Sequence, residues 1–141
     1  MPATIVPNEG ELVLLDYMLR LTTNNDEQVL RLFQNDVTPD QDTTDGTFTE
    51  ANFQGYESVT LVRGDWDAAT TNQSGRAESR YSNAPLTFTC TGTGNTIYGY
   101  WVETADPSPT VLYAQKFDNM KPMGNGDSLN INPIFSISGD A

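Results

Sequence analysis

The chain has 141 residues, the usual length of one domain. Its 19 acidic and 7 basic residues give a formal net charge of −12, which repels nucleic-acid phosphates and anionic membrane surfaces. No apolar run approaches the roughly 18 residues of a membrane-spanning helix. Met1–Pro7 also lacks the basic and apolar character of a secretory signal, so we expect synthesis in a cytoplasm without export.

The sequence contains no histidine, the commonest general base near neutral pH and the commonest metal ligand. Histidine-based catalytic triads and most zinc sites are thereby excluded. The single Cys90 has no histidine to activate it, and it alternates with Leu86 and Phe88 on an apolar face, so we expect it in the core. These features predict a protein that is not an enzyme, with no catalytic residue, cofactor or metal ion.

The N-terminal segment has the pattern of one amphipathic helix over about residues 9–20. Asn8 and Glu11 have the spacing of a capping box, in which each residue satisfies a free backbone donor at the helix start. Apolar residues then recur at helical spacing: Leu12, Leu15, Met18 and Leu19. We therefore expect an arm and helix over residues 1–20, followed by a single β domain over residues 21–141.

The middle of the chain alternates apolar clusters with polar loops. Residues 29–33 are typical of a strand buried on both faces, and the acidic segment 35–46 predicts a long loop. One helical turn is expected over residues 49–53, and a strand over 56–63. Trp66 follows that strand as an expected anchor.

The last third shows the clearest strand patterns. Residues 86–91 alternate apolar residues with threonine, and we expect them to form a hairpin with residues 97–102. Further strands are expected over 111–117 and 129–137. Pro133 lies in the last of these and favours a sheet edge, because proline donates no backbone hydrogen bond.

Aromatic residues crowd the expected strand 97–102. Strict alternation places Ile97 and Trp101 on one face and Tyr98, Tyr100 and Val102 on the other. Such a face packs in a core or an interface, or forms a sugar-binding surface; core or interface is favoured.

Together the segments predict a mainly β protein, an antiparallel β-sandwich of jelly-roll or Greek-key type with one N-terminal amphipathic helix. The strand order stays open.

Carboxylates offer two alternatives to a purely structural role. Asp40, Asp42, Asp45 and Gly46 resemble an EF-hand loop, but the third acid comes one place late and Glu50 falls one place short of the twelfth position. A looser calcium site in residues 36–45 stays open. A carboxylate-dependent hydrolase also stays open, although 19 acids make any single pair uninformative.

Arg63, Gly64 and Asp65 spell an integrin-binding tripeptide, which carries weight only on an exposed loop tip. These residues are more typical of the end of a strand.

Several stretches are similar to small structural proteins of tailed phages and environmental viral sequences. They are IVPNEGE at 5–11, LLDYML at 14–19, LRLFQN at 30–35, VTP at 37–39, YESVTL at 56–61, NTIYGYWV at 95–102, NGDSL at 125–129 and IFSI at 134–137. The resemblance covers nearly the whole chain and includes packing and turn signatures but no catalytic motif.

The resemblance implies a virion location after assembly in the host cytoplasm. The role that the resemblance favours is capsid decoration or cement. In this role the partner is the phage major capsid protein, and the chain self-associates as a trimer. A tail, baseplate or fibre-tip role that binds a receptor or glycan is the alternative. For the capsid role, the expected partner interface is the N-terminal apolar face: Ile5, Leu12, Leu15 and Met18.

Overall fold

A computed structural model describes residues 4–7, 28–61, 65–67, 70–71, 73, 77–83, 85–105 and 107–137. Within these ranges the protein is mainly β, with antiparallel sheets, and the helical element described from end to end is a 3-10 turn at Asp45–Thr47. None of the described segments is a helix long and apolar enough to cross a membrane. The helix expected over residues 9–20 lies outside the described residues.

The widest sheet has four antiparallel strands in the order β2-β1-β6-β7. These are β1 (Gln28–Phe33), β2 (Val59–Leu61), β6 (Thr96–Thr104) and β7 (Val111–Pro122). Leu30 of β1 faces Val59 on one side and Val102 on the other. The apolar cluster expected as a doubly buried strand therefore lies inside the sheet, where it has neighbours on both edges.

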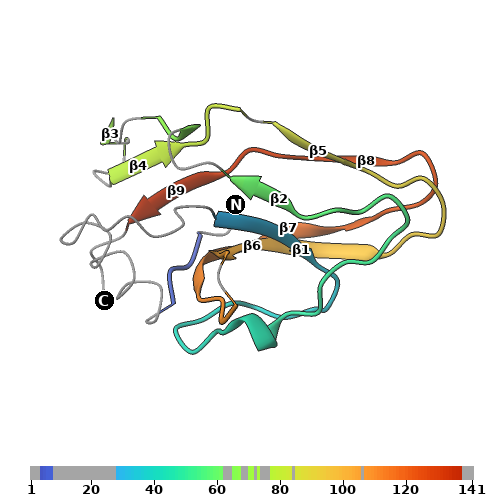
Figure 1. The fold of residues 1–141 in the computed structure, drawn as a ribbon, viewed down its shortest axis with the longest axis horizontal. Coiled ribbons are helices and arrows are strands. Elements are labelled where there is room, and N and C mark those ends of the chain that lie inside the picture. The colour runs from blue at the N-terminus through green and yellow to red at the C-terminus, as the bar shows by residue number, and fades with distance from the viewer. Residues whose placement is uncertain are drawn as a thin grey trace.

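The other strands form two smaller antiparallel sheets, β5-β8 and β3-β4-β9. They are β3 (Thr70–Thr71), β4 (Ala77–Arg80), β5 (Leu86–Thr89), β8 (Ser128–Ile131) and β9 (Ile134–Ile137). Figure 1 shows these two sheets following one another along one side of the molecule. The single strand expected over 129–137 was wrong, because β8 and β9 belong to different sheets. Pro133 lies fully buried in the break between them, where its missing backbone N–H interrupts no ladder.

A single apolar cluster joins the four-stranded sheet to the β5-β8 pair. Leu32 and Val102 from the wide sheet share it with Phe88 of β5 and Ile131 of β8. Cys90 belongs to the same cluster and is completely buried, which confirms its expected core position.

A smaller cluster is centred on Phe33, Phe48 and Trp101. The Phe48 and Trp101 rings stack with their centroids 4.6 Å apart. Phe48 comes two residues after the end of the acidic segment 35–46, so this ring anchors the end of that loop to the sheet.

The expected hairpin between residues 86–91 and 97–102 was wrong. β5 pairs with β8, and β6 pairs with β1 and β7. The burial patterns explain the difference. β6 is buried along nearly its whole length, so it takes a central place with a partner on each side, whereas β5 exposes Thr87 and Thr89.

The faces of β6 also depart from strict alternation. Ile97, Tyr100 and Val102 share the larger cluster, while Tyr98 packs with Trp101 in the smaller one. A register shift between Ile97 and Gly99 explains this, because a β-bulge moves the following side chains to the opposite face.

Two local predictions also change. Residues 49–53 form no helical turn; Glu50 makes a β-bridge to Phe33, and Gly55 turns the chain with a φ of 93°. β7 runs on to Pro122, five residues beyond the strand expected over 111–117. It tolerates these additional residues because it bulges opposite Ile97 and Gly99.

Candidate functional site

The structure places Ile5, the one described member of the expected partner interface, beside β7. The Ile5 N–H donates to the Ala114 carbonyl at 2.8 Å, and the Ala114 N–H donates to the Ile5 carbonyl at 2.9 Å. Ile5 is half-buried, and Val6 next to it packs against the larger core cluster. Leu12, Leu15 and Met18 lie outside the described residues, so the structure does not bring the four residues together.

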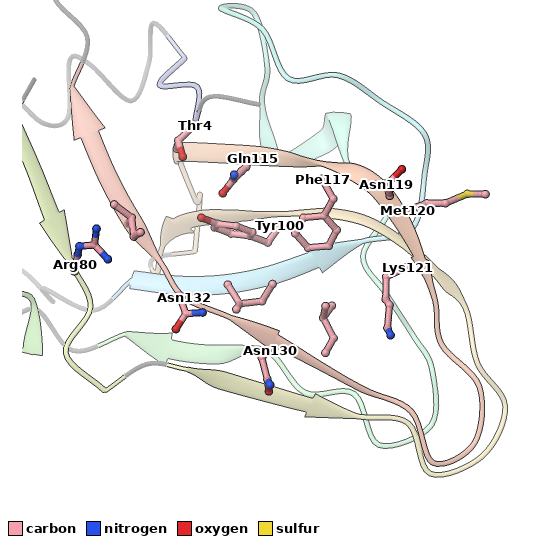
Figure 2. Close-up of a pocket in the computed structure, with 13 residues that line it drawn as sticks. Thr4, Arg80, Tyr100, Gln115, Phe117, Asn119, Met120, Lys121, Asn130 and Asn132 are labelled. Atoms are coloured by element: carbon pink, nitrogen blue, oxygen red, sulfur yellow. The ribbon is translucent and has the colours of Figure 1, made fainter. Parts of the chain in front are cut away.

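An open groove of about 790 Å³ lies between β7 and the segment formed by β8 and β9. Figure 2 shows the Tyr100 and Phe117 rings side by side within it, and Thr4 at one end. Its lining is Thr4, Arg80, Tyr100, Gln115, Phe117, Asn119, Met120, Lys121, Leu129, Asn130, Ile131, Asn132 and Ile134. We call this the β7–β8 groove.

The two walls of the groove are built differently. β7 contributes mainly alternate residues, Gln115, Phe117, Asn119 and Lys121, which is the pattern of a strand that presents one face. From Leu129 to Asn132, consecutive residues line the groove. Consecutive lining residues indicate that this strand presents its edge.

The floor is apolar and continuous with the core. Tyr100 and Ile131 are core members, and Phe117 and Leu129 pack against the same cluster. The Tyr100 and Phe117 ring centroids lie 6.4 Å apart. Burial raises the pKa of Tyr100 to about 12, an effect that the neighbouring Thr4 hydroxyl partly offsets.

Polar groups surround this floor. Four amide side chains line the groove: Gln115, Asn119, Asn130 and Asn132. Arg80 and Lys121 add two cations, and no carboxylate is among the lining residues. Because the chain carries 19 acids and 7 bases, this local composition runs against its overall charge. The groove can therefore hold apolar groups flanked by hydrogen-bonding or negatively charged ones.

A second polar cluster surrounds Arg31 on β1. Arg31 Nη1 donates to Glu50 Oε2 at 2.9 Å, and Arg31 Nε donates to Glu103 Oε2 at 3.3 Å. Burial alone would lower the pKa of Arg31, but its hydrogen bond and attraction to Glu50 and its attraction to Glu103 raise it overall. Glu103, 5% exposed, also accepts from Trp101 Nε1.

These bonds join β1, β6 and the segment around Glu50, so we read the Arg31 cluster as a structural tie. The sequence signal for this cluster is Arg31 itself, which lies inside a strand expected to be buried on both faces, because buried charges require partners.

The acidic loop does not assemble a metal site within the described part of the chain. No grouping there of three acidic or cysteine side chains could hold a metal ion. Asp36 pairs with Lys116, and Asp40 Oδ1 accepts from the Asp42 N–H at 2.9 Å.

Two other sequence candidates are engaged in packing. Asp65, the described residue of the Arg-Gly-Asp tripeptide, accepts from Asn83 Nδ2 at 2.7 Å. Trp66 forms a β-bridge with Tyr81 and contacts its ring edge-on at a centroid distance of 5.4 Å. Trp66 therefore anchors the β2–β3 connection, as expected.

The chain matches no protein-family model, and no curated protein is similar to it at a significant level.

Sequence pattern does not predict the groove, because its walls come from strands far apart in the chain. Phe117, Asn119 and Lys121 lie at or beyond the end of an expected strand, and Asn130 and Asn132 lie on the polar face of another. The sequence signal for this wall of the groove is the alternation of period two, which continues through residues 115, 117, 119 and 121.

Proposed function

We propose that this chain is a non-enzymatic structural protein of a tailed-phage virion, which binds the major capsid protein and stabilises the shell as a decoration or cement protein. The virion location rests on the resemblance of the sequence stretches given above. The observation that supports a binding role is the β7–β8 groove, because binding sites are typically concave surfaces with an apolar lining and a few convergent polar groups. Met120, 57% exposed, adds a large apolar side chain to its lining.

We also infer that the sheets form a sandwich of jelly-roll or Greek-key type. The shared core cluster of the wide sheet and the β5-β8 pair supports this. Self-association, as a trimer, belongs to the same proposal, with Ile5, Leu12, Leu15 and Met18 at the partner interface.

Copy number in purified virions tests the capsid role. A decoration protein occupies repeated capsid sites, so quantitative mass spectrometry is expected to find it at hundreds of copies per particle. Replacing Leu12, Leu15 and Met18 together with serine is expected to lower its occupancy on capsids, while Thr60→Ser at an exposed position leaves occupancy unchanged. Absence from purified virions would overturn the proposal.

The alternative role, a tail, baseplate or fibre-tip component that binds a receptor or glycan, has one observation in its favour. Amide side chains and an aromatic ring in one groove, here Asn130 and Asn132 with Phe117, suit sugar hydroxyls and the apolar face of a pyranose. A copy number of a few per virion, together with binding on a glycan array, would favour it over the capsid role.

A further inference from the structure

We propose that the β7–β8 groove receives an extended segment of another polypeptide, which adds as a strand to the open edge of β8 and covers the inner face of β7. This deepens the proposed function, because it names the kind of partner surface that the chain binds. The inference rests on the proposed function in one respect only, namely that the chain has a protein partner.

The first observation is the edge of β8. Among the described strands, β8 pairs with β5 alone. The Cys90 N–H donates to the Asp127 carbonyl at 2.9 Å, which fixes the phase of this ladder. Backbone groups of an antiparallel strand turn alternately to its two sides, so Leu129 and Ile131 bond to β5 and Asn130 turns its N–H and C=O toward the groove. These groups are a template for one more strand.

The second observation is the uncovered floor. The wide sheet has four strands, whereas the β5-β8 pair opposite it has two. Phe117 and Leu129 are only partly buried although they pack on the core. A strand beside β8 would lie over Phe117 and Tyr100 and remove this apolar area from water, which is the main source of favourable free energy in such an association. The volume of about 790 Å³ suits side chains as well as backbone.

The chain itself provides a precedent for strand addition here. Residues 4–7 pair with the outer edge of β7 through the two Ile5–Ala114 hydrogen bonds, and Thr4 already lines one end of the groove. Extended backbone therefore already adds to a sheet edge at this end of the groove.

The charged residues that line the groove indicate which side chains the bound segment carries. Figure 2 shows Arg80 at one end of the groove and Lys121 at the other. No carboxylate lines the space between them. An occupant with alternating apolar side chains and an acidic residue near each end would match the apolar floor and the positive charge at the two ends, because charges within a Debye length of roughly 8 Å still interact at physiological salt.

Synthetic heptapeptides test the proposal with the full-length protein. The probe is an acetylated peptide of sequence EVTVTVE, compared with KVTVTVK and with an EVTVTVE peptide N-methylated at alternate residues. Backbone amide NMR titrations are expected to show saturable shifts at Asn130 and at Phe117. The methylated peptide keeps its side chains but lacks the strand-pairing donors, so its affinity should fall at least about tenfold.

Variants of groove residues test the charge preference and the strand pairing separately. Lys121→Glu leaves Arg80 as a cation at one end and puts an acid at the other, so it is expected to abolish the preference for EVTVTVE over KVTVTVK. Lys116→Glu makes the same change in net charge, but Lys116 pairs with Asp36 and does not line the groove, so the preference should persist. Asn130→Pro removes the outward N–H at a sheet edge that tolerates proline and should abolish the shifts while the remaining amide spectrum is retained.

Equal binding of the methylated peptide would overturn strand addition. So would the absence of saturable shifts, or shifts that fall only outside β7 and β8. Displacement of the peptide by a neutral oligosaccharide, with saccharide shifts at Phe117 and Asn130, would assign the groove to a glycan instead. These outcomes are independent of copy number in virions, so failure here leaves the proposed virion role to its own test.

Discussion

The Tyr56 hydroxyl donates a 2.7 Å hydrogen bond to Glu50 Oε2, and the same hydroxyl accepts from the Leu32 N–H at 3.2 Å. Tyr56 thus joins β1 to the carboxylate that also pairs with Arg31. Tyr56→Phe removes the hydroxyl and leaves a buried donor and acceptor with fewer partners. We expect a loss of about 2 kcal/mol in the free energy of unfolding, measured by urea denaturation. Tyr98→Phe, at a half-buried tyrosine of the same sheet, is the control and should change stability by less than about 0.5 kcal/mol.

Glu103→Gln tests the buried end of the Arg31 cluster. Glu103 accepts from both Trp101 and Arg31, whereas a glutamine offers one oxygen and an amino group that repels the second donor. We expect a loss of about 1–3 kcal/mol in unfolding free energy. Glu57→Gln, at an exposed position, makes the same chemical change and should be nearly neutral. Equal stability of both variants would contradict the structural role assigned to the cluster.

Gly99 occupies a position where β7 and an aromatic ring approach the backbone closely. An added Cβ would lie 2.2 Å from the Gln115 carbonyl oxygen and 2.6 Å from Phe33 Cζ. Gly99→Ala should therefore separate β6 from β7 and cost about 3 kcal/mol or more of stability, measured by thermal and urea unfolding. Gly46→Ala is the matched control, because its Cβ would meet only Thr44 Oγ1, at an ordinary 3.8 Å.

Alkaline pH should destabilise the fold through its buried tyrosines. Burial raises the pKa of Tyr100 to about 12, and burial raises those of Tyr113 and Tyr56 as well, with the Glu50 hydrogen bond contributing at Tyr56. The unfolded chain releases these phenol protons near the ordinary value of 10.0, whereas the folded chain retains them. The stabilisation is therefore fully present below pH 10 and declines as pH rises toward 12.

Urea midpoints at about pH 9 and about pH 11 measure this decline, with each such tyrosine contributing at most roughly 1.4 kcal/mol per pH unit. Tyr100→Phe should make the dependence on pH shallower. An unchanged slope in that variant would show that Tyr100 ionises equally in the folded and unfolded chains.

Much of the secondary structure could be predicted from local pattern. The threonine alternation of residues 86–91 predicted a half-exposed strand, and Thr87 and Thr89 are exposed beside buried Phe88. The burial of Cys90 followed from the same phase. Both succeed because the period of a strand is a property of neighbouring residues alone.

Which strands lie side by side could not be predicted in this way. The hairpin expectation failed because β5 pairs with β8, some forty residues away in the chain, and no local period encodes the partner. The bulge between Ile97 and Gly99 likewise places Ile97 and Trp101 on opposite faces of β6, although alternation predicted one shared face. It depends on how β6 fits against β7, which is a property of two segments together.

The sequence by itself determined the chemistry that this protein has at its disposal: a net charge of −12, no histidine, one cysteine and strands rich in aromatic and β-branched residues. These depend only on which residues are present and on their spacing. The tertiary structure alone decided where an apolar floor stays open, because Phe117, Leu129 and Ile131 meet only after β7 and β8 have taken their places in separate sheets. The groove exists because the wide sheet extends beyond the two-stranded pair that packs on it, and the widths of sheets are set by long-range pairing.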